Sequence, residues 1–158
     1  MLGWFKSNER VYAERLYEAL AVRELGNITP QLLGIPKRHH KWYQEKALLY
    51  REFWCLCALS AVARDLELFP VLSELEKLVV AKRKQRGFDT RDHDKLMEAA
   101  FDSLQELGEN PMGWAKAWLE EFDAEPDDGP ITFLRFADHW LRQFEAVKGA
   151  IHSGSADN

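Results

Sequence analysis

The sequence predicts an all-α fold: a single-domain bundle of about six helices with a long central helix. Three observations predict this class. Apolar side chains recur every three or four positions through most of the chain, which is the helical period. Proline and glycine clusters divide these stretches, and none of them alternates apolar and polar residues as a half-buried strand does. The 158 residues are 46% hydrophobic, which is enough for one sizeable core.

The first two helices are expected at Asn8–Leu25 and His39–Glu67. Ser7 can cap the first helix, and Gly26 ends its apolar period. The connection that follows holds two glycines and two prolines, so we expect an ordered loop there. The second helix is apolar on nearly every side in its middle, as a helix surrounded by others should be. It is therefore the expected central helix.

Four more helices are expected over Pro70–Arg86, Asp92–Leu107, Met112–Asp123 and Ile131–Lys148. Proline suits the first turn of a helix, and aromatic residues four apart give the last two helices a strong apolar face, which we interpret as core. The bundle domain should span residues 1–150, with residues 151–158 as a disordered tail. The side chains expected in the core include Trp54, Leu59, Phe101 and Trp140.

Several classes of protein are disfavoured by composition. The longest apolar run, Phe53–Ala63, is shorter than the roughly 20 residues that span a bilayer. The N-terminal residues lack the apolar segment of a signal peptide, so we expect a cytoplasmic protein. Cys55 and Cys57 lie two apart on one helix, where they cannot comfortably form a disulfide or a cysteine zinc site. The sequence contains no nucleophile elbow, phosphate-binding loop or dinucleotide fingerprint.

Charge is distributed unevenly along the chain. Residues 1–91 carry a net charge of +5 and residues 92–158 carry −10, which together give the chain its −5. Two basic runs stand out, one at the start of the second helix and one at the end of the third. Antiparallel packing of these helices would bring the runs together as one exposed patch at a pole of the bundle. The predicted partner-binding residues are Lys37, Arg38, His39, His40, Lys41, Lys82, Arg83, Lys84 and Arg86.

A patch of this kind suits an acidic protein surface, or the acidic half of a second copy of the chain. Our leading interpretation is a small cytoplasmic helical interaction module, adaptor or regulatory, without catalytic residues, metal or cofactor. A nucleic-acid-associated regulator ranks third, because an overall pI near 5.6 disfavours binding to phosphates.

The second interpretation rests on four residues that could hold a metal. His40, the adjacent pair His93 and Asp94, and Asp138 occur in the order His, His-Asp, Asp. This order resembles that of the HD-domain phosphohydrolases, which are helical proteins. The resemblance implies a divalent metal held by these four side chains, and a water that the metal activates for phosphate ester hydrolysis.

Overall fold

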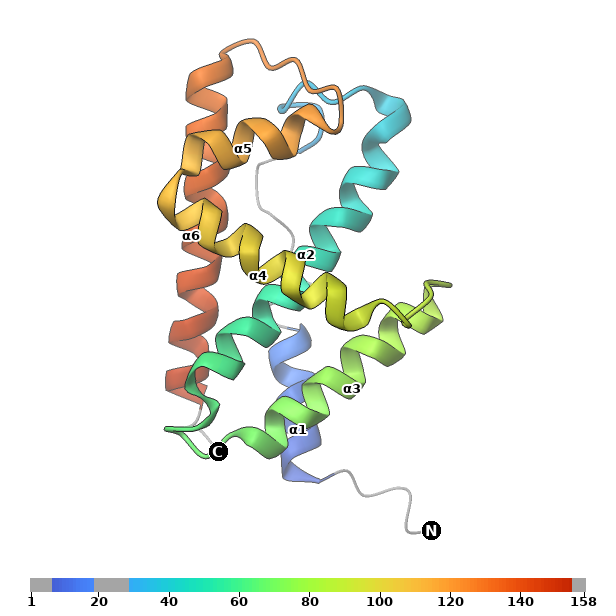
Figure 1. Cartoon of the computed structure of the whole chain (residues 1–158), viewed down its shortest axis with the longest axis vertical. Helices are drawn as coiled ribbons and strands as arrows, with labels where there is room; N and C mark the ends of the chain where they lie inside the picture. The colour runs from blue at the N-terminus through green and yellow to red at the C-terminus, as the bar shows by residue number, and fades with distance from the viewer. Residues whose placement is uncertain (1–6, 19–28, 155–158) are drawn as a thin grey trace.

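The computed structural model describes residues 7–18 and 29–154, and all regular structure in these ranges is helical. The predicted all-α bundle is confirmed, with the six helices in the predicted order (Figure 1). A short 3-10 helix, η3 (Lys37–His39), precedes the second of them. The α-helices are α1 (Asn8–Leu16), α2 (His40–Ala63), α3 (Phe69–Gln85), α4 (His93–Glu109), α5 (Pro111–Glu120) and α6 (Gly129–Gly154).

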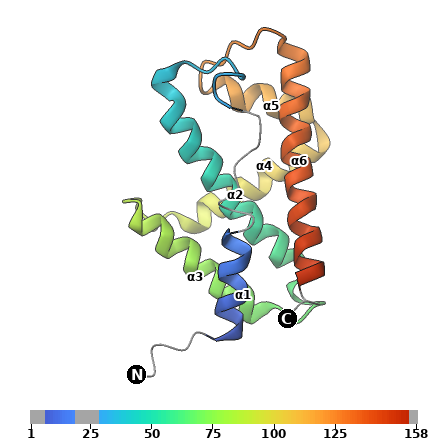
Figure 2. The same cartoon turned by 180° about the vertical axis from the view of Figure 1, so that it is seen from behind.

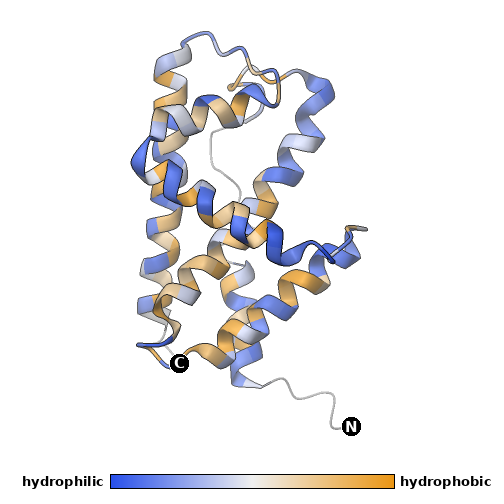
Figure 3. Cartoon of the chain, viewed as in Figure 1, coloured by the Kyte–Doolittle hydropathy of each residue, from blue (hydrophilic) through white to orange (hydrophobic). Residues whose placement is uncertain are grey.

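The central position of α2 is also confirmed. It packs against α3, α4 and α6, while α1 lies on α3 and α5 lies against α4 and α6. In Figures 1 and 2, α6 runs along one long side of the molecule and α2 crosses the interior. Figure 3 shows apolar residues along the later part of α2 and hydrophilic residues at its start. The later part of α2 therefore lies in the core, and its first turns reach the surface.

The turn between α2 and α3 sets the geometry of the candidate site. The second helix ends at Ala63, before the predicted Glu67, because the amide of Leu68 donates to the Ala63 carbonyl at 2.8 Å. Glu67 closes this turn in the left-handed conformation, with φ of 56°. The chain then reverses, and α2 and α3 diverge as an antiparallel V (Figures 1 and 2). The start of α2 and the end of α3 consequently lie on the same side of the molecule.

The predicted end of α3 is nearly correct, whereas the predicted end of α6 is too early. The third helix ends at Gln85, one residue before the predicted Arg86, because Gly87 adopts φ of 86° and the amide of Phe88 donates back to the Arg83 carbonyl at 3.1 Å. The sixth helix continues past Lys148 to Gly154. Its last turns are held by α1, since the Tyr12 hydroxyl donates to the carbonyl of the buried Ile151 at 3.1 Å. Residues 19–25 of the predicted first helix and 155–158 of the predicted tail lie outside the described residues.

Three of the four predicted core side chains are buried: Trp54, Leu59 and Trp140. The prediction for Phe101 is wrong, since this side chain is 49% exposed. Ala100 faces the core instead, and its carbonyl accepts a hydrogen bond from the indole of Trp54 at 2.9 Å. Phe101 is one position further along the helix, so it is rotated by about 100° away from that contact. The buried positions of α4 are His93, Ala100 and Leu107.

The aromatic faces of α5 and α6 form core, as predicted. Trp114 stacks on Phe136 with ring centroids 5.6 Å apart. Trp118 packs edge-on against Tyr43 of α2, at 5.5 Å. The contact with Tyr43 packs the first turns of α2 against α5.

Candidate partner-binding site

The first predicted basic run, residues 37–41, lies on η3 and the first turn of α2. Both of its lysines are exposed. Arg38 Nη2 and His39 Nε2 approach the same carboxylate oxygen of Asp123, at 3.4 and 3.1 Å. Asp123 belongs to the segment after α5, so that segment partly neutralises the run. His40 Nε2 lies 2.8 Å from a backbone carbonyl and is half-buried.

The second basic run, at the end of α3, is less exposed than the sequence predicted. Lys84 is exposed, and the Lys82 ammonium lies above the Tyr17 ring at 5.8 Å from its centroid. Arg83 is only 4% exposed, which contradicts the expectation of an exposed patch. The difference arises because one side of this run faces inward: Lys82 and Arg86 contact Tyr17 at the end of α1, and Arg83 lies against Phe53 of α2.

Arg86 is directed toward an acid that the sequence analysis did not single out. Its Nη2 donates to Glu52 Oε1 at 2.6 Å, and the Tyr17 hydroxyl donates to Glu52 Oε2 at 2.9 Å. The Glu52 side chain is fully buried. Burial raises the pKa of Glu52, against the opposing effect of Arg86, and burial together with Glu52 raises the pKa of Tyr17 to about 12. The available signal for this cluster was the position of Glu52, directly before the apolar run Phe53–Ala63 of a helix expected to be central.

A pocket of about 150 Å³ opens between the first turns of α2 and the end of α3. We call it the arginine pocket. Its aromatic walls are partly open to solvent, with Trp42 47% exposed and Phe88 39% exposed. The residues that line it are Trp42, Glu45, Lys46, Leu49, Arg83, Arg86 and Phe88.

Arg83 is the most unusual side chain of the arginine pocket. Its Nε and Nη1 atoms are buried and have no hydrogen-bond acceptor among the described residues. The carboxylate that approaches it, Asp92 Oδ1, is 4.0 Å from Nη1. Its guanidinium carbon lies 5.7 Å from the ring centroids of both Phe53 and Phe88. Aromatic rings attract a cation but do not replace the hydrogen bonds that burial removes, so Arg83 keeps the capacity to bind an anion.

The two predicted basic runs do not contribute equally to this pocket. Of the nine predicted partner-binding residues, Arg83 and Arg86 line it. Lys46, which was not predicted, lines it as well. The Lys46 ammonium pairs with Glu121 and lies 4.9 Å from the Trp118 ring centroid. The first run, on η3 and the first residues of α2, ends directly before Trp42, so it flanks the pocket.

The four residues of the metal-site alternative lie in separate surroundings. His40 is bonded at the start of α2, and His93 is buried against the Phe53 ring with Glu76 at 3.4 Å. Asp138 pairs with its helical neighbour Arg142 at 2.8 Å. In the described part of the chain, no three His, Cys, Asp or Glu side chains are grouped closely enough to hold a metal ion. The geometry that the HD-domain resemblance implies is therefore missing from these residues.

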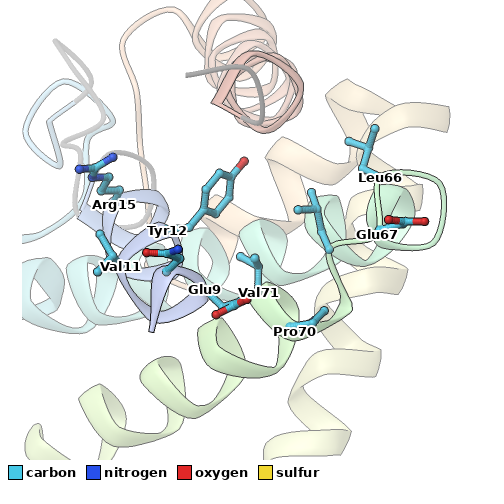
Figure 4. A pocket seen from close by; sticks show the side chains of 10 residues that line it. Glu9, Val11, Tyr12, Arg15, Leu66, Glu67, Pro70 and Val71 are labelled. Carbon is cyan, nitrogen blue, oxygen red and sulfur yellow. The ribbon is translucent and has the colours of Figure 1, made fainter. Parts of the chain in front are cut away.

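A larger pocket, of about 620 Å³, lies between α1 and the start of α3 (Figure 4). Its charged side chains, Glu9, Arg15 and Glu67, are of both signs and reach solvent. The hydroxyl of its tyrosine, Tyr12, already donates to a backbone carbonyl. None of the described residues that line this pocket is a buried cation comparable to Arg83, so the arginine pocket is the better candidate for a binding site.

The fold and the site together define an all-α single-domain bundle with a cationic pocket at the open end of an antiparallel helix pair. Compared with family models, curated proteins and solved structures, the chain shows no significant match to any of the three. In the described ranges, none of the helices combines the length and apolar character needed to cross a membrane.

Proposed function

We propose that this chain is a small cytoplasmic protein-interaction module, regulatory in role and without catalytic chemistry of its own. It binds an acidic segment of another protein at the arginine pocket and the flanking run of residues 37–41. The observation that carries this proposal is Arg83, a buried cation that lines an open pocket and whose paired carboxylate among the described residues, Asp92, is 4.0 Å away. A buried charge costs free energy unless it is paired, so an anion from a partner would relieve that cost.

The flanking run supports the same function in another way. Lys37, Arg38 and Lys41 are exposed, and Lys41 is paired only at 4.0 Å with Glu45. Exposed charges contribute little to affinity at short range, but they attract an oppositely charged partner during its approach. Their contribution should therefore fall as salt is added. A second copy of the chain is a further acidic partner, because residues 92–158 carry −10.

A selection from random peptides tests this proposal. The immobilised protein is offered a displayed library of short random peptides at low salt, and the bound peptides are sequenced. We expect peptides rich in Asp and Glu, with affinities that decline as salt rises. Enrichment of neutral or basic peptides would overturn the proposal. Sedimentation of the free protein over a range of concentrations reports whether a second copy competes for the site.

Two triple variants with equal charge change separate recognition from general attraction. The site variant replaces Lys37, Arg38 and Lys41 with Ser, and the control variant replaces two lysines and one arginine on other exposed surfaces. A selected acidic peptide should lose more affinity, and more of its salt dependence, with the site variant than with the control. Equal losses would mean that the peptide responds to net charge alone, which contradicts the proposal. The control positions are Lys95, Lys116 and Arg142.

A further inference from the structure

We propose that the arginine pocket accepts a single carboxylate from the partner, carried by an Asp or Glu side chain that stands next to an aromatic or aliphatic residue. This inference rests on the proposed function and specifies what the bound acidic segment must contain. Three properties of the pocket lead to it: the charge that it leaves uncompensated, its volume and its walls.

The charge of the pocket favours one negative charge. Three cationic side chains line it in the described part of the chain. Arg86 is paired with Glu52 at 2.6 Å, and Lys46 is paired with Glu121. The carboxylate that also lines the pocket, Glu45, lies 4.0 Å from the Lys41 ammonium. Arg83 remains, and among the described residues its nearest paired carboxylate, that of Asp92, is 4.0 Å away. A carboxylate matches this single charge, whereas a phosphate monoester, with a charge of about −1.5 to −2 at neutral pH, would need a second unpaired cation.

The volume of the pocket favours the end of a side chain. At about 150 Å³ it is well below the roughly 300–1,000 Å³ of pockets that enclose whole small molecules. A carboxymethyl or carboxyethyl group fits such a space, while the rest of the partner would remain outside. The guanidinium is planar and presents its N–H groups as a fork, which suits the two oxygens of a carboxylate.

The walls of the pocket favour an apolar neighbour to that carboxylate. Trp42 and Phe88 expose large parts of their rings at the rim. The Trp42 ring is held from behind by Phe122, with centroids 4.7 Å apart, and by His39, at 5.6 Å. A wall held in this way loses little conformational entropy when a partner covers it. An apolar residue on these rings would also exclude water from Arg83 and so strengthen its pairing with the carboxylate.

The position of Arg83 is fixed before a ligand arrives. Its guanidinium carbon lies 5.7 Å from the ring centroids of both Phe53 and Phe88, and the side chain is almost fully buried. The ligand consequently does not have to order a flexible arginine, and geometry alone can select for a planar anion. Lys84, on the same stretch of helix, is exposed and does not line the pocket, so it provides a matched control.

Three short capped peptides test the inference on the intact protein. They share one neutral Gly and Ser background and carry, before a phenylalanine, either Glu, Gln or phosphoserine. Binding is followed by the NMR signal of the Arg83 Nε–H group and by titration of the backbone amides. We expect the Glu peptide to shift the Arg83 signal and to bind about tenfold or more tightly than the Gln peptide, as expected for a charge-assisted pair. Replacing the phenylalanine with Gly should weaken the Glu peptide severalfold.

Two outcomes with the unmodified protein would overturn the inference. Equal binding of the Glu and Gln peptides would show that no carboxylate is recognised. Tenfold tighter binding of the phosphoserine peptide would show that the pocket holds a dianion. Both comparisons use the natural chain, so they remain decisive even if a variant at Arg83 fails to fold.

Variants then separate this inference from the proposed function. Arg83→Lys keeps the charge but loses the planar fork, and it should weaken the Glu peptide about tenfold, whereas Lys84→Met should leave that affinity within about twofold. If Arg83→Lys has no effect while the triple change at Lys37, Arg38 and Lys41 abolishes binding of selected acidic peptides, the module binds acidic partners elsewhere and only this inference falls. If the natural protein binds no acidic peptide at all, both fall.

Discussion

The guanidinium of Arg86 donates to the carboxylate of Glu52 at 2.6 Å and so ties the end of α3 to a fully buried acid of α2. Tyr17, at the end of α1, donates to the other oxygen of that carboxylate at 2.9 Å. Three helices therefore meet at one side chain. Because Arg86 also lines the arginine pocket, the same contact holds one wall of the candidate site.

Replacing Arg86 with Met should destabilise the protein by about 3 kcal/mol. Removal of one partner of a buried pair leaves the other charge uncompensated, which typically costs about 3–5 kcal/mol. The lower end applies here, because the Arg86 side chain is 30% exposed and water can partly replace it. Urea denaturation followed by circular dichroism measures the change.

The double variant Glu52→Leu with Arg86→Met should be more stable than Arg86→Met alone. In the double variant neither charge of the pair remains, and a cycle that includes Glu52→Leu alone isolates the interaction between the two residues. Lys84→Met is the matched control on the same helix, with an expected change within about 0.5 kcal/mol. Additive effects of the two substitutions would contradict the pairing.

Alkaline pH should destabilise the protein partly through Tyr17. Its pKa is about 12 in the folded protein and near 10.0 in an unfolded chain. Between these values the folded state holds the proton more tightly, so the free energy of unfolding falls as the pH rises. Tyr17→Phe should reduce this fall by up to about 2 kcal/mol between pH 10 and 12. Denaturation curves at several pH values measure the difference, and parallel pH profiles of the two proteins would contradict it.

Replacing Trp140 and replacing Phe101 should differ sharply in effect on stability, although the sequence pattern places both side chains in the core. Trp140 is 1% exposed, so Trp140→Ala should cost about 3–5 kcal/mol through lost packing. Phe101 is 49% exposed, so Phe101→Ala should cost less than about 1 kcal/mol. Urea denaturation compares the two variants. Similar losses would place Phe101 in the core, where the sequence pattern alone puts it.

The fold was predictable because its signals are local. Helical periodicity, prolines at first turns and Gly87 after α3 each mark an element without reference to the rest of the chain. The end of α2 was not predictable in this way. Glu67 takes the left-handed position that glycine usually occupies, and only the reversal into α3 requires it to do so.

The candidate site was predictable only in part, because it depends on packing between helices. The basic residues at the end of α3 were visible in the sequence, but which of them faces inward depends on how α3 lies against α1 and α2. Arg83 and Lys84 are neighbours in sequence, yet one is buried and the other exposed. Lys46 lines the pocket and Glu52 binds Arg86, and neither role was predictable because both depend on how α2 packs against its neighbours.

The loop before α2 should depend on Gly34 for its contact with the segment after α5. The amide of Glu125 donates to the Gly34 carbonyl at 3.0 Å, and Gly34 adopts φ of 69°. A Cβ at this position would overlap the carbonyl of Glu125, and its backbone conformation disfavours any other residue. Gly34→Ala should therefore destabilise the protein by about 2 kcal/mol or more.

Gly149→Ala should have the opposite effect on stability to Gly34→Ala. Gly149 lies within α6, and open space surrounds the position of its Cβ. Alanine favours the helix by about 0.5–1 kcal/mol over glycine, so this variant should be slightly more stable than the natural protein. Urea denaturation of both variants measures the change in the free energy of unfolding, which should fall for Gly34→Ala and rise for Gly149→Ala. A neutral Gly34→Ala would mean that the loop moves away from Glu125 without cost, and that the start of α2 is positioned without this contact.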